Sequence, residues 1–229
     1  LRVALVVTHA NSYVGVPHYV TCLAGALAAE HEVTVFSSDV PESTNSEFSH
    51  RTVPTTGDET LFDLTFSLNC AAQLSESELR RGDAFDVVHS HHNGTALFAD
   101  VVTAHYCERE AVGRIAAAGN DPPDARAQTV ALARAQIEHS LFGRLTTTNL
   151  VVLSEAMKRQ FLDHHETPQD RIHVVPSGVD SGRFTPANVG KHREAVRRRH
   201  SVSPDCPLIL FVGGDWGRKG LYQAVEALS

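Results

Sequence analysis

The chain has 229 residues, of which 42% are hydrophobic and 21% charged, as in an ordinary globular protein of one large or two small domains. Its formal net charge of −7 argues against nucleic acid as a general partner. No apolar run has the length of a membrane span and no signal peptide is visible, so we predict a cytoplasmic protein. The chain starts without Met and ends within a helical pattern, so we expect both ends to be cut from a longer protein.

The first sixty residues predict a strand–helix–strand unit of a parallel sheet. Arg2–Thr8 is an apolar run typical of a buried strand, and Glu32–Ser37 is a second. Between them, the loop His9–Pro17 contains Gly15, and His18–Ala29 has the apolar spacing of an amphipathic helix. The loop lacks the G-x-G-x-x-G pattern of dinucleotide sites, which argues against NAD or FAD.

The same alternation continues to about residue 175. Strands are predicted at Arg51–Val53, Ala84–Ser90, Asp100–Ala104, Leu150–Leu153 and Arg171–Val175, and helices at Leu61–Arg81, Glu108–Ala118, Ala125–Leu145 and Ser154–His164. Ser154 is predicted to cap the last of these helices. Alternating strands and helices predict an α/β fold, a Rossmann-like, doubly wound parallel sheet with helices on both faces.

The composition changes after residue 186. We assign 1–186 to a first domain, the polar and basic stretch 187–207 to a linker with a short helix, and 208–229 to the first strand–helix unit of a second domain. Leu208–Val212 is an apolar run typical of a strand buried on both faces, and Leu221–Leu228 has helical spacing. The arginines of the run 191–199 are predicted to form a solvated helix face.

A glycine-rich turn with two cations lies between that strand and helix. Gly213, Gly214 and Gly217 permit a tight turn, and Arg218 and Lys219 follow directly. Free backbone N–H groups at a helix start and two cations can converge on an anion, so the pattern indicates a phosphate site. A surface loop with a solvated Arg–Lys pair is the alternative that the pattern leaves open.

Residues at the carboxyl ends of the strands are the site candidates, because open parallel sheets bind ligands there. They are Gly15, His89, His91, His105, Ser154, Gly178 and the 213–219 loop. Gly15 either lets backbone approach a ligand or only makes a turn. His105 is either a site residue or a hydrogen-bonded histidine beneath the sheet edge. With a basic pair in another domain, the distribution predicts a cleft between two lobes that holds a phosphorylated ligand.

No metal site is predicted. Cys22, Cys70, Cys107 and Cys206 have no C-x-x-C spacing, so we expect free thiols in a reducing compartment rather than a disulfide framework or a zinc site. The clusters of adjacent histidines, 89–92 and 164–165, could in principle bind a metal. Neighbouring strand residues point to opposite faces, however, and no Asp or Cys lies at ligand spacing, so polar loops are the better interpretation.

Five segments, in this order along the chain, carry a resemblance to a known family: Phe85–His91, Val101–His105, Val151–Lys158, Val174–Pro186 and Phe211–Gly220. The most specific is Val174–Pro186, with the pattern V-P-x-G-V-D-x-x-x-F-x-P. Together they resemble the GT-B glycosyltransferases of the large retaining family that includes sucrose synthase, glycogen synthase and bacterial mannosyl- and glucosyltransferases. The resemblance implies two Rossmann-like lobes, with the acceptor bound mainly by the first and a nucleotide-sugar donor mainly by the second.

The resemblance also implies roles for single residues. Arg218 and Lys219 match the basic pair that holds the donor diphosphate; two cations there stabilise the leaving group, so neither a metal nor another cofactor is expected. Gly15 matches the glycine loop that approaches the donor, and His105 matches the histidine near the transferred sugar. The catalytic candidates are therefore His105, Arg218 and Lys219, and the donor-binding candidates are Gly15, Gly213, Gly214 and Gly178.

Three features depart from the family pattern. Val14-Gly15 stands where many members have two glycines, and Gly214 stands where many have an additional Arg. The family's Glu-x7-Glu motif would lie beyond Ser229, so the fragment alone is expected to be inactive.

The predicted function is transfer of a sugar from a nucleotide-sugar donor to a sugar, lipid-linked or small-molecule acceptor, with retention of anomeric configuration. A sugar-nucleotide epimerase or a glycoside phosphorylase on the same fold is an alternative, as is a non-catalytic carbohydrate-binding module if the chain is complete. No nucleic-acid partner is expected. Contact with a membrane surface through the basic stretch 191–199 is a weaker alternative.

Overall fold

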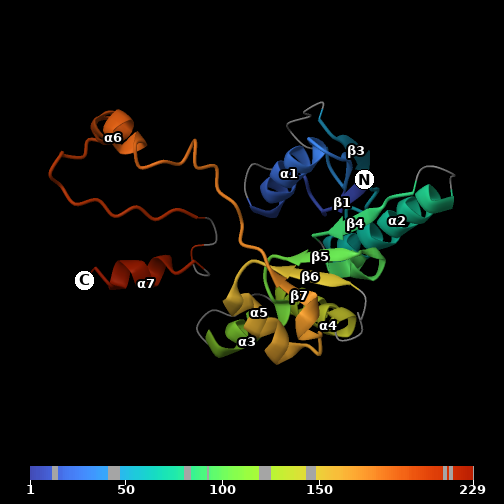
Figure 1. Ribbon diagram of the computed structural model, residues 1–229. Helices are drawn as coiled ribbons and strands as arrows, with labels where there is room; N and C mark the ends of the chain where they lie inside the picture. Colours follow the sequence, from blue (N-terminus) through green and yellow to red (C-terminus); the bar gives the residue numbers. More distant parts are fainter. Residues whose placement is uncertain are drawn as a thin grey trace. The chain divides into compact units, whose positions relative to one another are not determined.

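The computed structural model divides the chain into two compact units, Leu1–Ser177 and Gly178–Ser229 (Figure 1). It describes residues 1–11, 15–40, 47–79, 84–91, 93–118, 125–142, 148–213, 216 and 219–228. The first unit contains a sheet with helices packed on it, and the described residues of the second contain two helices.

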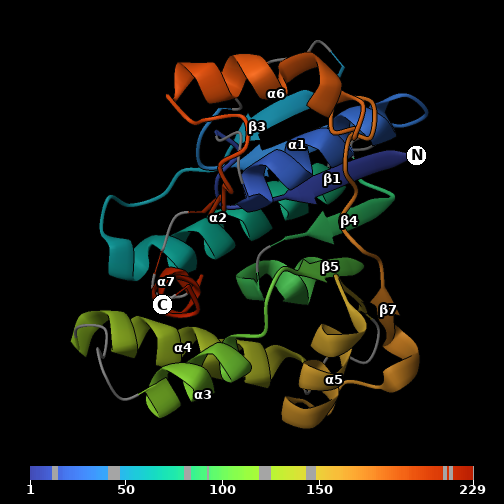
Figure 2. The same cartoon turned by 90° about the vertical axis from the view of Figure 1, so that its left-hand side faces the viewer.

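The described strands form a seven-stranded parallel sheet in the order β3-β2-β1-β4-β5-β6-β7, which Figure 2 shows from β3 at the top to β7 at the bottom. Their bounds are β1 Arg2–Val6, β2 Glu32–Ser37, β3 Ser49–Thr52, β4 Val87–Ser90, β5 Val101–Ala104, β6 Asn149–Val152 and β7 Ile172–Val174. The chain moves outward from β1 in one direction and from β4 in the other. The topological switch point therefore lies between β1 and β4, and the predicted doubly wound parallel sheet is confirmed.

The helices of the first unit lie at or near their predicted positions. They are α1 Gly15–Ala28, α2 Glu59–Leu79, α3 Glu108–Ala118, α4 Ala125–Phe142 and α5 Glu155–His164, with the short 3₁₀ helices η1 Asn93–Phe98 and η2 Gln169–Arg171. Ser154 caps α5 as predicted, because its hydroxyl accepts the backbone N–H of Met157 at 3.1 Å. Within the described residues, no helix combines the length and the apolar content needed to cross a membrane.

Both faces of the sheet are covered because successive strand residues point to opposite sides. Leu5 of β1 packs in one buried cluster with Val20 of α1. Val6, on the other face, packs in a second cluster with Phe66 of α2. A third cluster continues this second face across β5, β6 and β7, where Phe161 of α5 is fully buried. The α1 face therefore remains distinct from the face that carries α2, α4 and α5.

The second unit contains α6 Asn188–Arg199 and α7 Leu221–Glu226. The short helix predicted in the linker is thus present, but one of its arginines is not solvated. Arg197 is buried, and its guanidinium donates hydrogen bonds to the backbone carbonyls of Ser203, at 3.1 Å from Nε, and of Cys206. A buried arginine is stable here because backbone carbonyls satisfy its donors. Arg197 thereby ties the segment after α6 back to the helix.

The predicted buried strand at Leu208–Val212 is wrong. These residues are not in a strand; Phe211 is partly buried, and the other four side chains are exposed, from 57% for Leu208 to 79% for Val212. A strand is stable only when a neighbour completes its hydrogen bonds, and the described part of the second unit contains no other strand that could do so. The apolar run alone therefore did not decide the structure.

Candidate functional site

The carboxyl ends of β1 and β4 meet at the switch point, where open α/β sheets bind their ligands. Beyond β1, the chain is held by Asp39, which follows β2. Its carboxylate accepts the backbone N–H groups of Ala10 at 2.6 Å and Asn11 at 3.1 Å, and lies 3.0 Å from Nδ1 of His9. The described part of the loop that leads from β1 to α1 is therefore fixed to the end of the neighbouring strand.

Three histidines lie together on the α1 face of the sheet, at the ends of β4 and β5. Nδ1 of His91 is 3.1 Å from Nε2 of His105, and the rings of His89 and His91 stack with their centroids 4.5 Å apart. His89 also forms a hydrogen bond of 2.8 Å between Nε2 and Oγ1 of Thr103. The structure thus brings the three predicted strand-end histidines, His89, His91 and His105, together.

Helix α1 reaches this histidine cluster and begins at the predicted glycine. Gly15 has φ +67°, in the region that favours glycine, and no described atom lies within 4 Å of where its Cβ would be. One turn further along α1, the ring of Tyr19 contacts the rings of His105 and His91 at centroid distances of 5.1 and 5.5 Å. The open backbone at Gly15 and the His105 ring therefore belong to one edge of the sheet.

Burial keeps these histidines neutral. It lowers the pKa of His89 to about 4, with a further contribution from His105, and lowers the pKa of His105 to about 4. The pKa of His91 is also lowered, first by burial and then by His89 and His105. Neutral imidazoles both donate and accept hydrogen bonds, as recognition of sugar hydroxyls requires. The hydrogen bond that His105 makes among the described residues uses Nε2, toward His91.

Apart from Gly15, the predicted donor-binding glycines belong to the second unit. Gly178 is exposed, and no described atom lies within 4 Å of its Cβ position. Gly213 has φ +153°, and the Cδ atom of Lys219 lies 3.4 Å from where its Cβ would be. The aliphatic stem of the exposed Lys219 therefore lies close to the backbone of Gly213. Arg218 and Gly214 lie outside the described residues.

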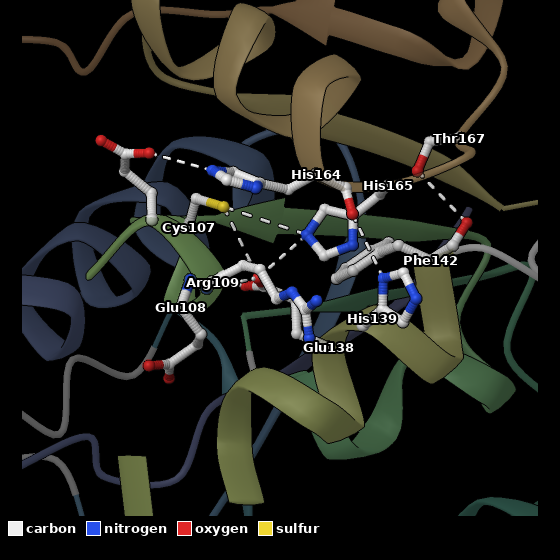
Figure 3. A network of polar contacts seen from close by, with 10 residues as sticks. Cys107, Glu108, Arg109, Glu138, His139, Phe142, His164, His165 and Thr167 are labelled. Carbon is white, nitrogen blue, oxygen red and sulfur yellow. Dashed lines mark hydrogen bonds and ion pairs between the residues drawn. The ribbon is translucent and has the colours of Figure 1, made fainter. Parts of the chain in front are cut away.

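The turn that follows His105 is anchored by a buried carboxylate that the sequence did not indicate. Glu138 of α4 is fully buried and accepts the backbone N–H groups of Glu108 at 2.9 Å and Arg109 at 3.1 Å, at the start of α3. A carboxylate at this position satisfies free N–H groups and suits the helix dipole. Figure 3 shows it beside His165, whose Nε2 is 3.0 Å away. A single Glu within a helix gives no local signal for such a contact.

The family model described as Glycosyltransferase Family 4 matches residues 13–183, about three quarters of the chain. The chain belongs to this family. The matched range contains Gly15, His105 and Gly178, and it ends before Gly213 and Lys219. The family assignment therefore rests on the sheet-bearing unit, in which the histidine cluster lies.

Curated relatives and a solved structure agree with this assignment. The chain is 30% identical over 95 residues to the lipopolysaccharide glucosyltransferase WaaG of Escherichia coli strain K12, covering 42% of this chain and 25% of that protein. It is 34% identical over 153 residues to the D-inositol 3-phosphate glycosyltransferase of Geodermatophilus obscurus, covering 62% and 31%. The crystal structure of WaaG matches with a TM-score of 0.75 at 22% identity, over 99% of this chain and 58% of that one.

These matches confirm the GT-B architecture that the sequence predicted. The sheet-bearing unit has the fold of the N-terminal lobe of a GT-B glycosyltransferase. The regions that match this chain make up only about a quarter to a third of the full length of the two curated relatives.

Proposed function

We propose that the protein to which this chain belongs transfers a sugar from a nucleotide-sugar donor to an acceptor, with retention of anomeric configuration. The observation that supports this most directly is the contact between His105 and α1, the helix that begins at Gly15, at the switch-point edge of a family 4 fold. A glycine backbone and a neutral hydrogen-bonding ring lie there together, where a parallel sheet binds its ligand.

His105 suits a place beside the transferred sugar because it is neutral. Positive charge develops on the sugar ring as a glycosidic bond breaks. A protonated imidazole would repel that charge, whereas the low pKa of His105 keeps the ring uncharged at neutral pH. With Nε2 engaged by His91, Nδ1 of His105 would make a hydrogen bond to a sugar hydroxyl.

Arg218 and Lys219 are proposed to bind the donor diphosphate. Negative charge builds up on this leaving group, and fixed cations stabilise it in the transition state. The closeness of the Lys219 stem to Gly213 supports the role, since it places this cation next to a glycine at which a ligand can approach the backbone. Gly178, Gly213 and Gly214 are proposed as points where the donor approaches the backbone. With two cations at the diphosphate, we expect transfer without an added metal.

The test uses the full-length protein with a panel of nucleoside diphosphate sugars. The acceptors are inositol phosphates and lipid-linked saccharides, the classes suggested by the names of the relatives. Release of nucleoside diphosphate measures turnover, nuclear magnetic resonance of the product gives its anomeric configuration, and an arm with EDTA tests metal independence. His105→Ala should lower turnover about 100-fold or more. The matched control is His173→Ala, since His173 is an exposed histidine of β7.

The outcomes separate the competing functions. An inverted product would reject retention, and conversion of the donor sugar without release of diphosphate would indicate an epimerase. Phosphate-dependent breakdown of a saccharide would indicate a phosphorylase. Equal turnover in the wild type and His105→Ala would assign His105 to packing beneath α1.

A further inference from the structure

Three buried side chains from separate parts of the chain converge beneath the turn that follows His105. Cys107 precedes α3, Glu138 lies in α4, and His165 follows α5 (Figure 3). Sγ of Cys107 is 3.6 Å from Oε1 of Glu138 and 3.9 Å from Nε2 of His165, and the last two atoms are 3.0 Å apart. Each of the three residues is buried, and the side chains of Glu138 and His165 are fully so.

The three atoms are spaced as zinc ligands are. The point equidistant from them lies about 2.1 Å from each, close to the usual bond lengths of roughly 2.0–2.3 Å to nitrogen, oxygen and sulfur. We propose that Cys107, Glu138 and His165 bind a zinc ion. The site is structural, because it lies in the core on the face away from the histidine cluster, and it does not take part in sugar transfer.

The ligand types and their charges favour zinc. Thiolate and imidazole are preferred zinc ligands, and carboxylate is a common third. A thiolate, a carboxylate and a neutral imidazole also balance the two charges of the ion, which removes the cost of leaving net charge in a dry core. The carboxylate is already oriented by the N–H groups of Glu108 and Arg109, the kind of outer contact that holds a ligand in place.

The expected affinity is lower than that of a four-ligand site. Zinc binding displaces the proton of the Cys107 thiol to solvent and leaves the proton of His165 on Nδ1, which has no partner among the described residues. A water molecule would take the fourth position. The ion would join α3, α4 and the end of α5, and so would stiffen the turn next to His105 without contacting substrate.

The experiment measures metal binding by the chain itself, apart from any catalytic assay. The metal-free chain is titrated with Co²⁺, which reports a thiolate ligand through its near-ultraviolet charge-transfer band, and zinc content is measured after dialysis. Cys107→Ser should abolish the band and the bound zinc. Cys70→Ser removes a buried thiol elsewhere, and Cys22→Ser removes an exposed thiol 3.6 Å from His18, so both controls should keep the site.

Thermal unfolding gives a second measurement. At free zinc about 100-fold above the dissociation constant, the midpoint of the wild type should rise by roughly 5–10 °C, and that of Cys107→Ser should not. Circular dichroism verifies that each variant is folded, and Glu138→Gln replaces Cys107→Ser if the latter is not.

Absence of a Co²⁺ band would overturn the proposal and leave a hydrogen-bonded network. A band lost only in Cys22→Ser would also overturn it, because the metal would then be on the surface of α1. Failure of sugar transfer in the full-length protein would leave this result unchanged.

Discussion

Acid should destabilise the sheet-bearing unit through the histidines beneath α1, and the contribution of His89 can be measured separately. Its pKa is about 4 in the folded protein, against about 6.5 in the unfolded chain. The unfolded chain therefore binds the proton more readily. The stability that the neutral His89 contributes is fully present above pH 6.5 and is lost as the pH falls toward 4. The free energy of unfolding attributable to His89 falls by about 2 kcal/mol at pH 5 and about 3 kcal/mol at pH 4.

The variant His89→Gln isolates this effect. Glutamine does not titrate, and its amide can still form a hydrogen bond with Thr103. Urea unfolding of both proteins is followed by far-ultraviolet circular dichroism between about pH 7.5 and pH 4. Tryptophan fluorescence is unsuitable, because Trp216 is the single tryptophan and belongs to the second unit. The wild type should lose about 3 kcal/mol more than the variant over this range.

The other buried histidines and the carboxylates titrate in both proteins, so the difference between the two curves belongs to His89. If the two stabilities fell in parallel, His89 would take up its proton as easily in the folded protein as in the unfolded chain. The neutral state of the cluster, and with it the argument that His105 is uncharged beside a sugar, would then be refuted.

Three further predictions concern packing, backbone and charge. Phe161→Ala should lower the free energy of unfolding by about 3–5 kcal/mol in urea unfolding, and Leu162→Ala, at a partly exposed neighbour, by much less; equal losses would contradict the assigned core. Gly15→Ala should cost about 1 kcal/mol through its positive φ alone, whereas Gly57→Ala, also in open space, should cost less; no difference would argue against the left-handed start of α1. In the full-length protein, Lys219→Ala should weaken binding of the nucleoside diphosphate about 10- to 100-fold in calorimetric titration and leave the free nucleoside unchanged. Equal losses for both ligands would mean that the substitution damages the fold.

Most of the fold was predictable because parallel strands that are buried on both faces consist of consecutive apolar residues. Arg2–Val6 and Glu32–Ser37 are such strands, and the polar loops between them mark the sheet edge. Gly15 and His105 could be named as edge residues for the same reason. The contact of His105 with Tyr19 could not be predicted, because it depends on how α1 packs across the sheet.

Two features could not be read from the sequence. Glu138 is a long way along the chain from Glu108 and Arg109, so its place at the start of α3 depends on tertiary packing alone. Leu208–Val212 has the composition of a buried strand but is mostly exposed and forms no strand, since hydrogen-bonding partners rather than composition decide whether a strand forms. The roles of Arg218 and Lys219 stay predictions.

The order of the strands has a consequence for synthesis of the chain. Val3 in β1 pairs with Val33 on one side and with Val87 on the other. At about 5–20 residues per second, a ribosome needs roughly 3–11 seconds to pass from the first partner to the second. During that interval, β1, an interior strand of the finished sheet, has one edge of unpaired N–H and C=O groups, to which another chain can add. The nascent protein is therefore most exposed to aggregation before β4 is made, and chaperone binding to ribosome-bound chains should be strongest at that length.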